Sequence, residues 1–134
     1  MIKNYCIMNM RPSFTSFNLL IAGGRDFSNY YLLARRCAAY IAENCGVQEP
    51  TILSGCASGA DSLGEQFAME YQLQCRFFPA QWKKYGRAAG PMRNRQMAQV
   101  ADGAVVFWDG KSKGTRSMIG YLRQMGVPFE VVQY

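Results

Sequence analysis

The stretch that decides the fold is Thr51-Ile52-Leu53-Ser54-Gly55-Cys56-Ala57-Ser58-Gly59-Ala60-Asp61. It begins as a short apolar strand, passes through small residues and enters a helical pattern of apolar positions. The first amides of a helix have no partner inside it, and the helix dipole adds partial positive charge there. Because small residues keep Cβ branches away from these amides, a phosphate or carboxylate can approach the bare backbone. The pattern predicts a nucleotide-binding domain, with Asp61 placed to cap the helix or to reach a ribose hydroxyl.

Strands and helices alternate along the rest of the chain. Short apolar runs predict strands at Asn18–Ala22, Thr51–Ser54, Cys75–Pro79, Gly103–Trp108 and Pro128–Val132. Helical patterns fall between Phe27 and Gly46 and near 61–71, 92–101 and 114–125, with a loop over 80–91. The alternation predicts an α/β fold, a mainly parallel sheet of about five strands with helices on both faces. We interpret residues 1–16 as an N-terminal extension and 17–134 as the domain.

The composition limits the classes of function. The 134 residues suffice for one domain with a real core, and 49% of them are hydrophobic. No apolar run reaches the length of a membrane span and the N-terminus lacks a secretion signal, so we expect a cytoplasmic protein without membrane contact. The chain has 5 cysteines, no C-x-x-C pair and no histidine. This favours reduced thiols, predicts no metal site, and excludes a Ser-His or Cys-His nucleophile.

The net charge of +6 is concentrated between Lys83 and Arg116. A basic segment of this kind favours an anionic partner, either a phosphorylated small molecule or a nucleic acid. The alternative is a solvated surface on which lysine and arginine are merely scattered.

Four loops follow the carboxyl ends of predicted strands, where ligands bind in parallel sheets. They are Gly23–Phe27, Ser54–Gly59, Ala80–Pro91 and Trp108–Thr115. In the first, glycines allow close approach of a ligand and Arg25 can grip a phosphate, although an ordinary turn with Asp26 near the helix start explains the same residues. The last loop offers the Gly114 amide and Thr115 hydroxyl at a helix start, with Lys111 or Lys113 nearby.

A further motif, Gly90-Pro91-Met92-Arg93-Asn94-Arg95, places polar side chains in a first helical turn. Arg93 can pair with a phosphate through two hydrogen bonds, and Asn94 can bind a base or sugar. Arg95 points elsewhere on the helix and is expected to be a bystander. The aromatic residues Trp82, Tyr85 and Trp108 can stack on a base, although Tyr85 fits a core or rim position at least as well.

Together these loops resemble the motif set of the YspA-like branch of the SLOG superfamily, which also includes the DprA DNA-processing proteins and the LOG phosphoribohydrolases. The resemblance runs from about residue 18 to the C-terminus and is carried by Gly23–Phe27, Ser54–Asp61, Phe78–Trp82, Gly86–Asn94 and Phe107–Thr115. It implies a Rossmann-like three-layer αβα fold and a site for a nucleotide or nucleotide derivative. With the residues singled out above, the expected ligand-binding set is Gly23, Gly24, Arg25, Asp26, Ser54, Gly55, Gly59, Asp61, Trp82, Arg93, Asn94, Trp108, Lys113, Gly114 and Thr115.

Two departures from the family pattern bear on activity. LOG enzymes carry a glutamate three residues after the Gly-Thr threonine, where this chain has Met118, and Cys56 stands where a glycine is usual. A cysteine there is tolerable unless its φ is positive. Similarity to DprA is confined to Ser54–Asp61 and Met92–Arg95.

We therefore expect a protein that binds a nucleotide derivative, to sense or sequester it, without a further cofactor and with a homo-oligomer as a plausible assembly. One alternative is a nucleoside-phosphate N-glycosidase, or phosphoribohydrolase-like enzyme, in which Asp26, Asp61 or Asp109 is the catalytic group. Another is a DprA-like protein that binds single-stranded nucleic acid along Lys83–Arg95.

Overall fold

The computed structural model describes residues 16–134, and the expected extension lies outside these residues except for Ser16. One sheet of five parallel strands has the order β3-β2-β1-β4-β5. Its strands are β1 (Ser16–Gly23), β2 (Glu49–Ser54), β3 (Gln74–Phe77), β4 (Gly103–Trp108) and β5 (Phe129–Gln133). The predicted α/β fold with a parallel sheet is confirmed. The strand order reverses between β1 and β4, which lie side by side, so the loops after these two strands diverge to opposite faces and leave room between them.

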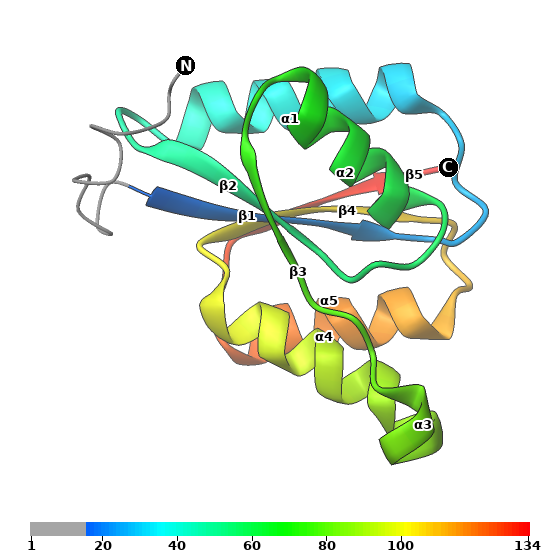
Figure 1. Cartoon of the computed structure of the whole chain (residues 1–134). Helices are drawn as coiled ribbons and strands as arrows, with labels where there is room; N and C mark the ends of the chain where they lie inside the picture. The colour runs from blue at the N-terminus through cyan, green and yellow to red at the C-terminus, as the bar shows by residue number, and fades with distance from the viewer. Residues whose placement is uncertain (1–15) are drawn as a thin grey trace.

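Helices cover both faces of the sheet and complete three layers (Figure 1). Above the sheet in this view lie α1 (Tyr30–Asn44) and α2 (Ala60–Glu70); below it lie α4 (Ala89–Val100) and α5 (Lys113–Gln124). A short helix α3 (Trp82–Tyr85) and a 3-10 turn η3 (Gly86–Ala88) connect β3 to α4. Among residues 16–134, no helix is both long and apolar enough to cross a membrane.

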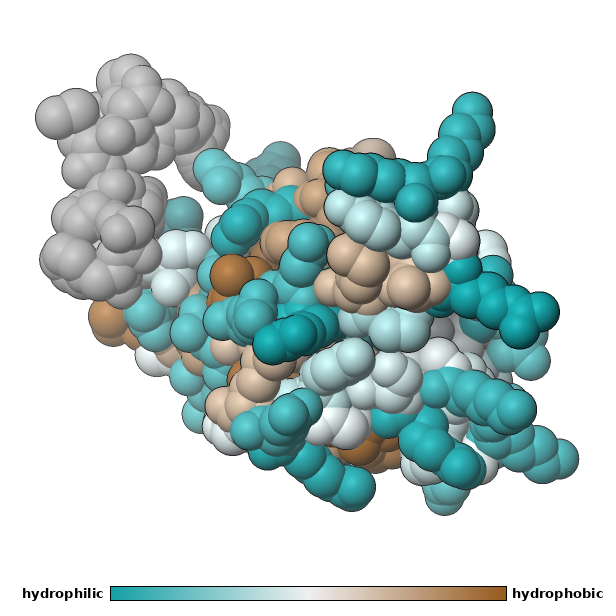
Figure 2. All heavy atoms as spheres, turned by 90° about the horizontal axis from the view of Figure 1, so that it is seen from below, coloured by the Kyte–Doolittle hydropathy of each residue, from teal (hydrophilic) through white to brown (hydrophobic). Residues whose placement is uncertain are grey.

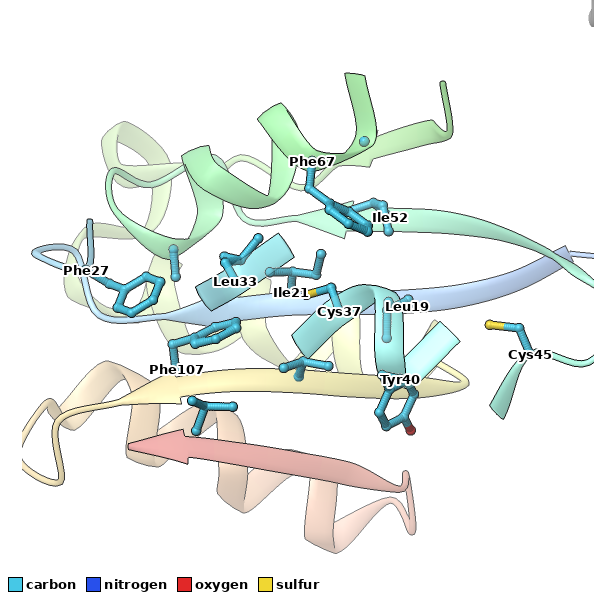
Figure 3. Packing of buried hydrophobic residues seen from close by; sticks show 14 of the residues in the cluster. Leu19, Ile21, Phe27, Leu33, Cys37, Tyr40, Cys45, Ile52, Phe67 and Phe107 are labelled. Carbon is cyan, nitrogen blue, oxygen red and sulfur yellow. The ribbon is translucent and has the colours of Figure 1, made fainter. Parts of the chain in front are cut away.

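Apolar residues fill the space between the sheet and each helix layer. On the α1–α2 side, Leu33, Cys37 and Phe67 pack against Ile21 and Ile52 (Figure 3). The opposite face has its own cluster, in which Leu20, Leu53 and Val106 meet Met97 of α4 and Leu122 of α5. Because β1 is covered on both faces, its residues 19–22 are all buried rather than alternating between core and solvent.

The structure corrects the sequence expectations in the segment after β3. Residues 80–91, expected as one loop, contain α3 and η3, and α4 begins at Ala89 rather than at Met92. Gly90 and Pro91 fall in the first turn of α4, where proline is tolerated because its missing N–H would have no helical partner. Arg93 and Asn94 therefore lie in the second turn of the helix, not the first.

One position of α1 differs from the sequence pattern. The helical period between Phe27 and Gly46 predicts Tyr31 on the apolar face, together with Leu33 and Cys37, but the Tyr31 side chain is 77% exposed. Tyr40 is buried in its place, and its hydroxyl reaches the carbonyl of Pro128 at 3.4 Å. A tyrosine fits either environment, so the helical period alone does not separate the two residues.

Candidate ligand-binding site

A cavity of about 380 Å³ opens at the carboxyl edge of the sheet, where the strand order reverses between β1 and β4. We call it the first cavity. It is bounded by the β1–α1 loop, by the starts of α2 and α5, and by one face of α4. Most of the predicted ligand-binding residues lie on its walls: Gly23, Gly24, Arg25, Asp26, Asp61, Arg93, Asn94, Gly114 and Thr115.

A second cavity of about 340 Å³ lies beside the first, on the β2 side of the sheet. Its walls come from the β2–α2 loop and from the segment that leads into α3, including Gly55 and Trp82 of the predicted set. Arg25, Ala57 and Arg93 belong to the walls of both cavities. These residues therefore form the boundary at which the two cavities meet.

Arg93 links three segments that are far apart in the sequence. Its side chain is 9% exposed; Nε donates to Asn94 Oδ1 at 3.0 Å, and Nη1 donates to the carbonyl of Gly55. Asn94 in turn donates through Nδ2 to the carbonyl of Gly114 at 3.4 Å. A Cβ at Gly55 would lie 2.8 Å from Nη1, so a glycine is needed there for the arginine to fit. The network joins α4 to the β2–α2 loop and to the start of α5.

One nitrogen of Arg93 stays open. Nη2 has no hydrogen-bond partner among the described residues. No fully buried side-chain nitrogen or oxygen in the described part of the chain lacks a partner, so Nη2 is accessible from the cavities. Burial lowers the pKa of this guanidinium, an effect that Asp61 opposes, and an arginine stays charged in proteins. The site thus offers a cationic donor held in place by two protein contacts.

Asp61 lies on the wall of the first cavity with its side chain 6% exposed. Its Oδ2 accepts a hydrogen bond from the Ala57 amide at 3.2 Å. Burial raises the pKa of this carboxyl to about 6, although the Ala57 amide and Arg93 both act in the opposite direction. Asp61 can therefore exchange a proton near neutral pH, as a hydrogen-bonding group or as an acid or base.

Gly59 was predicted to face the ligand, but it serves the contact between two loops. Its φ is +75°, and a Cβ would come within 2.2 Å of the Gly24 carbonyl oxygen. That carbonyl also accepts the Ala60 amide at 3.1 Å, while the Gly24 amide donates to Phe107 at 3.0 Å. Gly59 lines neither cavity because the β1–α1 loop lies directly against it.

Asp26 is held by a residue that sequence reasoning missed. The Tyr134 hydroxyl donates to Asp26 Oδ1 at 2.6 Å, and the tyrosine ring centroid lies 4.8 Å from that of Phe27. Burial and the bond to Asp26 raise the pKa of Tyr134. The partners are 108 positions apart, so no local pattern predicts their contact. The contact fixes the β1–α1 loop against the end of the sheet.

The β4–α5 loop is organised by two residues that were predicted to act on a ligand. Asp109 Oδ1 accepts the amides of Lys111 and Ser112, each at 2.8 Å, and these bonds lower the pKa of the carboxyl. The Trp108 indole donates to the Ser112 carbonyl at 3.1 Å. Ser112 caps α5 by accepting the Thr115 amide at 3.3 Å. Neither Trp108 nor Asp109 lines the first or the second cavity, and both bond within their own loop.

The start of α5 remains open to the first cavity. The amides of Lys113 and Gly114 lie in the first turn, where they have no partner within the helix. A Cβ at Gly114 would meet nothing within 4 Å. The Lys113 side chain is exposed and lines neither cavity.

Two positions in the β2–α2 loop also differ from expectation. Ser54 is 1% exposed; its hydroxyl bonds to Glu65 Oε2 at 2.5 Å and accepts the Cys56 amide at 3.1 Å, so it lines neither cavity. Cys56 has a φ of +68°, the left-handed region that disfavours a side chain. Because this φ is positive, the cysteine that stands in place of the usual glycine is under backbone strain.

Three apolar residues that were not predicted as site residues, Ala22, Met97 and Met118, form the apolar floor of the first cavity. Apolar residues at helical or strand spacing predict only a core, so nothing in the pattern separates these from ordinary core residues. Met118 is 2% exposed and occupies the place of the LOG glutamate. The first cavity thus has a thioether where that family has a carboxylate.

A third hollow, of about 460 Å³, lies at the opposite edge of the sheet, where the strands begin. Its polar groups bond mainly to one another: Ser16 Oγ lies 3.1 Å from Thr51 Oγ1, and Asp102 Oδ2 accepts the Asn18 amide at 2.8 Å. Arg76 also lines this hollow, but none of the predicted ligand-binding residues lies there.

The fold and the cavities define an α/β domain with a ligand site at the carboxyl edge of a parallel sheet. Residues 17–85, more than half of the chain, match the model of a family described as YspA, cpYpsA-related SLOG family. The chain belongs to this family, which confirms the resemblance seen in its motifs.

A similar solved structure is the X-ray structure of DNA processing protein A (DprA) from Streptococcus pneumoniae. The TM-score is 0.66 at 16% sequence identity, and the likeness covers 89% of this chain and 50% of that one. This chain therefore spans about half the length of that protein, and at this identity the likeness shows the fold alone. No curated protein matches the sequence.

Proposed function

We propose that this protein binds a nucleotide or nucleotide-derived anion in the first cavity and holds it without chemical turnover. Family membership and fold support a nucleotide-related or nucleic-acid-binding role in general terms. The observation that carries the narrower proposal is Arg93, a buried arginine whose Nη2 is open to the cavity while Nε donates to Asn94 Oδ1 and Nη1 donates to the Gly55 carbonyl. A fixed cationic donor loses little freedom when an anion binds, so it favours tight recognition of phosphate.

The other walls suit the remaining parts of a nucleotide. The free amide of Gly114 lies on the cavity wall at a helix start that attracts negative charge. Asn94 and Thr115 supply polar groups for sugar hydroxyls, and the apolar floor formed by Met97 and Met118 suits a base. In this arrangement the phosphate lies at Arg93 and the nucleoside enters the first cavity.

The side chains favour binding over hydrolysis. Of the three proposed catalytic aspartates, Asp26 is bonded to Tyr134 and Asp109 is bonded to the amides of its own loop. Asp61 is the remaining candidate, and Met118 replaces the carboxylate with which a LOG enzyme would assist it. The enzyme alternative therefore depends on Asp61 alone.

The first experiment is to denature the purified protein, identify released small molecules by mass spectrometry, and screen nucleoside mono- and diphosphates by thermal shift. A nucleotide that stabilises the protein should lose most of its effect in Gly114→Leu, because the added side chain reaches the open side of α5 at the cavity. Gly120→Leu is the matched control, since it adds the same side chain to the same helix where nothing lies within 4 Å and no cavity is lined.

The proposal is overturned if no nucleotide is found and none stabilises the protein, or if both leucine variants bind equally well. Release of free base from any nucleotide, abolished in Asp61→Asn, would instead establish the N-glycosidase alternative.

Nucleic acid is the second candidate, favoured by the exposed side chains of Lys83, Lys84, Arg87 and Arg95 around α3 and α4. Seen from the side of α4 and α5, the surface is mostly hydrophilic, and long hydrophilic side chains project near the carboxyl edge of the sheet, at the right in both views (Figure 2). A phosphate track of this kind predicts an affinity for oligonucleotides that falls steeply with salt. A nucleotide held in the first cavity predicts a shallow dependence.

A further inference from the structure

The second cavity gives information on the class of ligand that the first cavity alone does not. Pockets for small ligands start at about 300 Å³, so a single nucleoside is sufficient to occupy the first cavity. The second cavity is of similar volume and shares Arg25, Ala57 and Arg93 with the first as lining residues. A mononucleotide leaves this second space unused.

We propose that the ligand consists of two units joined by a diphosphate. The nucleoside lies in the first cavity, the diphosphate crosses the shared wall at Arg25 and Arg93, and a flat ring enters the second cavity to stack on Trp82. This inference rests on the proposed function, because it extends a ligand that is already bound in the first cavity.

The charges at the boundary fit a diphosphate. Arg93 offers Nη2, and the exposed guanidinium of Arg25 has no hydrogen bond or ion pair among the described residues. Both side chains line both cavities, so an anion at the boundary meets two cations whichever cavity it comes from. A diphosphate bridge carries two negative charges, and arginine pairs with such oxygens through directed hydrogen bonds.

The walls of the second cavity suit a flat, uncharged ring. Trp82 is 49% exposed and its ring is held against α4, since a Cβ at Gly90 would lie 3.2 Å from the indole. Arg25 is stacked on the same indole, 6.0 Å from the ring centroid. Pro79 and Ala80 add apolar surface, and no acidic side chain lines this cavity. An aromatic group can therefore stack on the indole next to the arginine that holds the diphosphate.

The test uses the base that stabilises the protein best in the nucleotide screen. Calorimetry then compares three probes with that base: the nucleoside monophosphate, the diphosphate and the symmetrical dinucleoside diphosphate. We expect the dinucleoside diphosphate to bind more tightly than the diphosphate by roughly five- to a hundredfold, the range that one base stacked on an aromatic side chain provides.

The variants locate the gain. Trp82→Ala should remove the gain of the dinucleoside diphosphate over the diphosphate, and Trp82→Phe should restore part of it. Tyr85→Ala is the matched control, because Tyr85 is an exposed aromatic residue of the same helix that lines neither cavity. Melting temperatures of all three variants show whether α3 stays in place.

Two outcomes overturn the inference while leaving the proposed function intact. In one, the dinucleoside diphosphate binds no more tightly than the diphosphate; in the other, the gain survives in Trp82→Ala. Failure of every probe to bind the wild-type protein would contradict the proposed function itself, so the two failures are distinguishable.

Discussion

The loops after β2 and β4 both contain glycine and serine and both lead into a helix, but they use their backbone amides differently. In the β4–α5 loop, Ser112 and Asp109 shape the turn, and the first amides of α5 remain open to the first cavity. In the β2–α2 loop, the Ala57 amide is bound by Asp61 and the Ala60 amide by the carbonyl of Gly24. The backbone amides thus remain accessible to a ligand after β4, whereas after β2 they are used in contacts within and between loops.

The two loops also place their carboxylates in different environments. Asp61 and Asp109 each accept backbone amides of their own loop. Burial dominates at Asp61 and raises its pKa, while at the half-buried Asp109 the amide hydrogen bonds dominate and lower it. An aspartate that accepts amides of its own loop can therefore have a raised or a lowered pKa, and the depth of burial decides which.

The largest expected effect comes from adding a methyl group to each loop. Gly59→Ala should destabilise the protein by about 3 kcal/mol or more, because the backbone conformation at φ +75° disfavours a side chain and the Cβ would meet the Gly24 carbonyl. Gly114→Ala should stabilise it by up to about 1 kcal/mol, since the position is helical and open. Urea unfolding of both variants measures the change in the free energy of unfolding. Equal changes would show that the two loops tolerate a side chain equally well.

An intermediate effect is expected from the pH dependence of stability. Since the pKa of Asp61 rises from an ordinary 3.8 to about 6 on folding, the folded state binds the proton more tightly than the unfolded state. Stability is therefore highest below about pH 4 and falls as pH rises to about 6, by about 3 kcal/mol for this group. Asp61→Asn should remove that fall, so at pH 7 it should be more stable than wild type.

The control for this prediction is Asp109→Asn in the other loop. The lowered pKa of Asp109 stabilises the folded state above its unfolded-state pKa, so this variant should lose stability at neutral pH. The charged groups that act on Asp61 are Arg93, Glu65 and Arg25, and they stay in place in both variants. Thermal unfolding between pH 4 and 8 tests the pair, and parallel profiles for the two variants would contradict the contrast.

The smallest effect is expected at Cys56. Cys56→Gly should stabilise the protein by about 0.5–1 kcal/mol, because a left-handed residue without a Cβ avoids the steric cost at φ +68°. Cys56→Ala keeps the Cβ and removes the thiol, so it should bring no such gain. A gain in both variants would assign the effect to the sulfur rather than to the backbone.

Much of the architecture could be predicted from the sequence because it depends on local patterns. Alternating apolar runs and helical periods predicted the parallel sheet, and β4 was placed at its observed bounds. The motifs also indicated which loops meet at the carboxyl edge, so Arg93, Asn94 and Gly114 were correctly predicted to come together. The predictions were wrong where the hydrophobic period is a weak signal. The short helix α3 was expected to be a loop, and Tyr31 was expected on an apolar helix face.

The sequence by itself determined which residues approach one another at the edge of the sheet, since strand direction and chain order fix the positions of the loops. Only the tertiary structure decided which of those groups remain available to a ligand. Ser54 is bonded to Glu65, Gly59 lies against Gly24, and Asp26 is bonded to Tyr134, whereas Arg93 keeps one nitrogen open. Hydrogen bonding and burial depend on contacts between segments that are distant in the sequence, and a local sequence pattern does not predict such contacts.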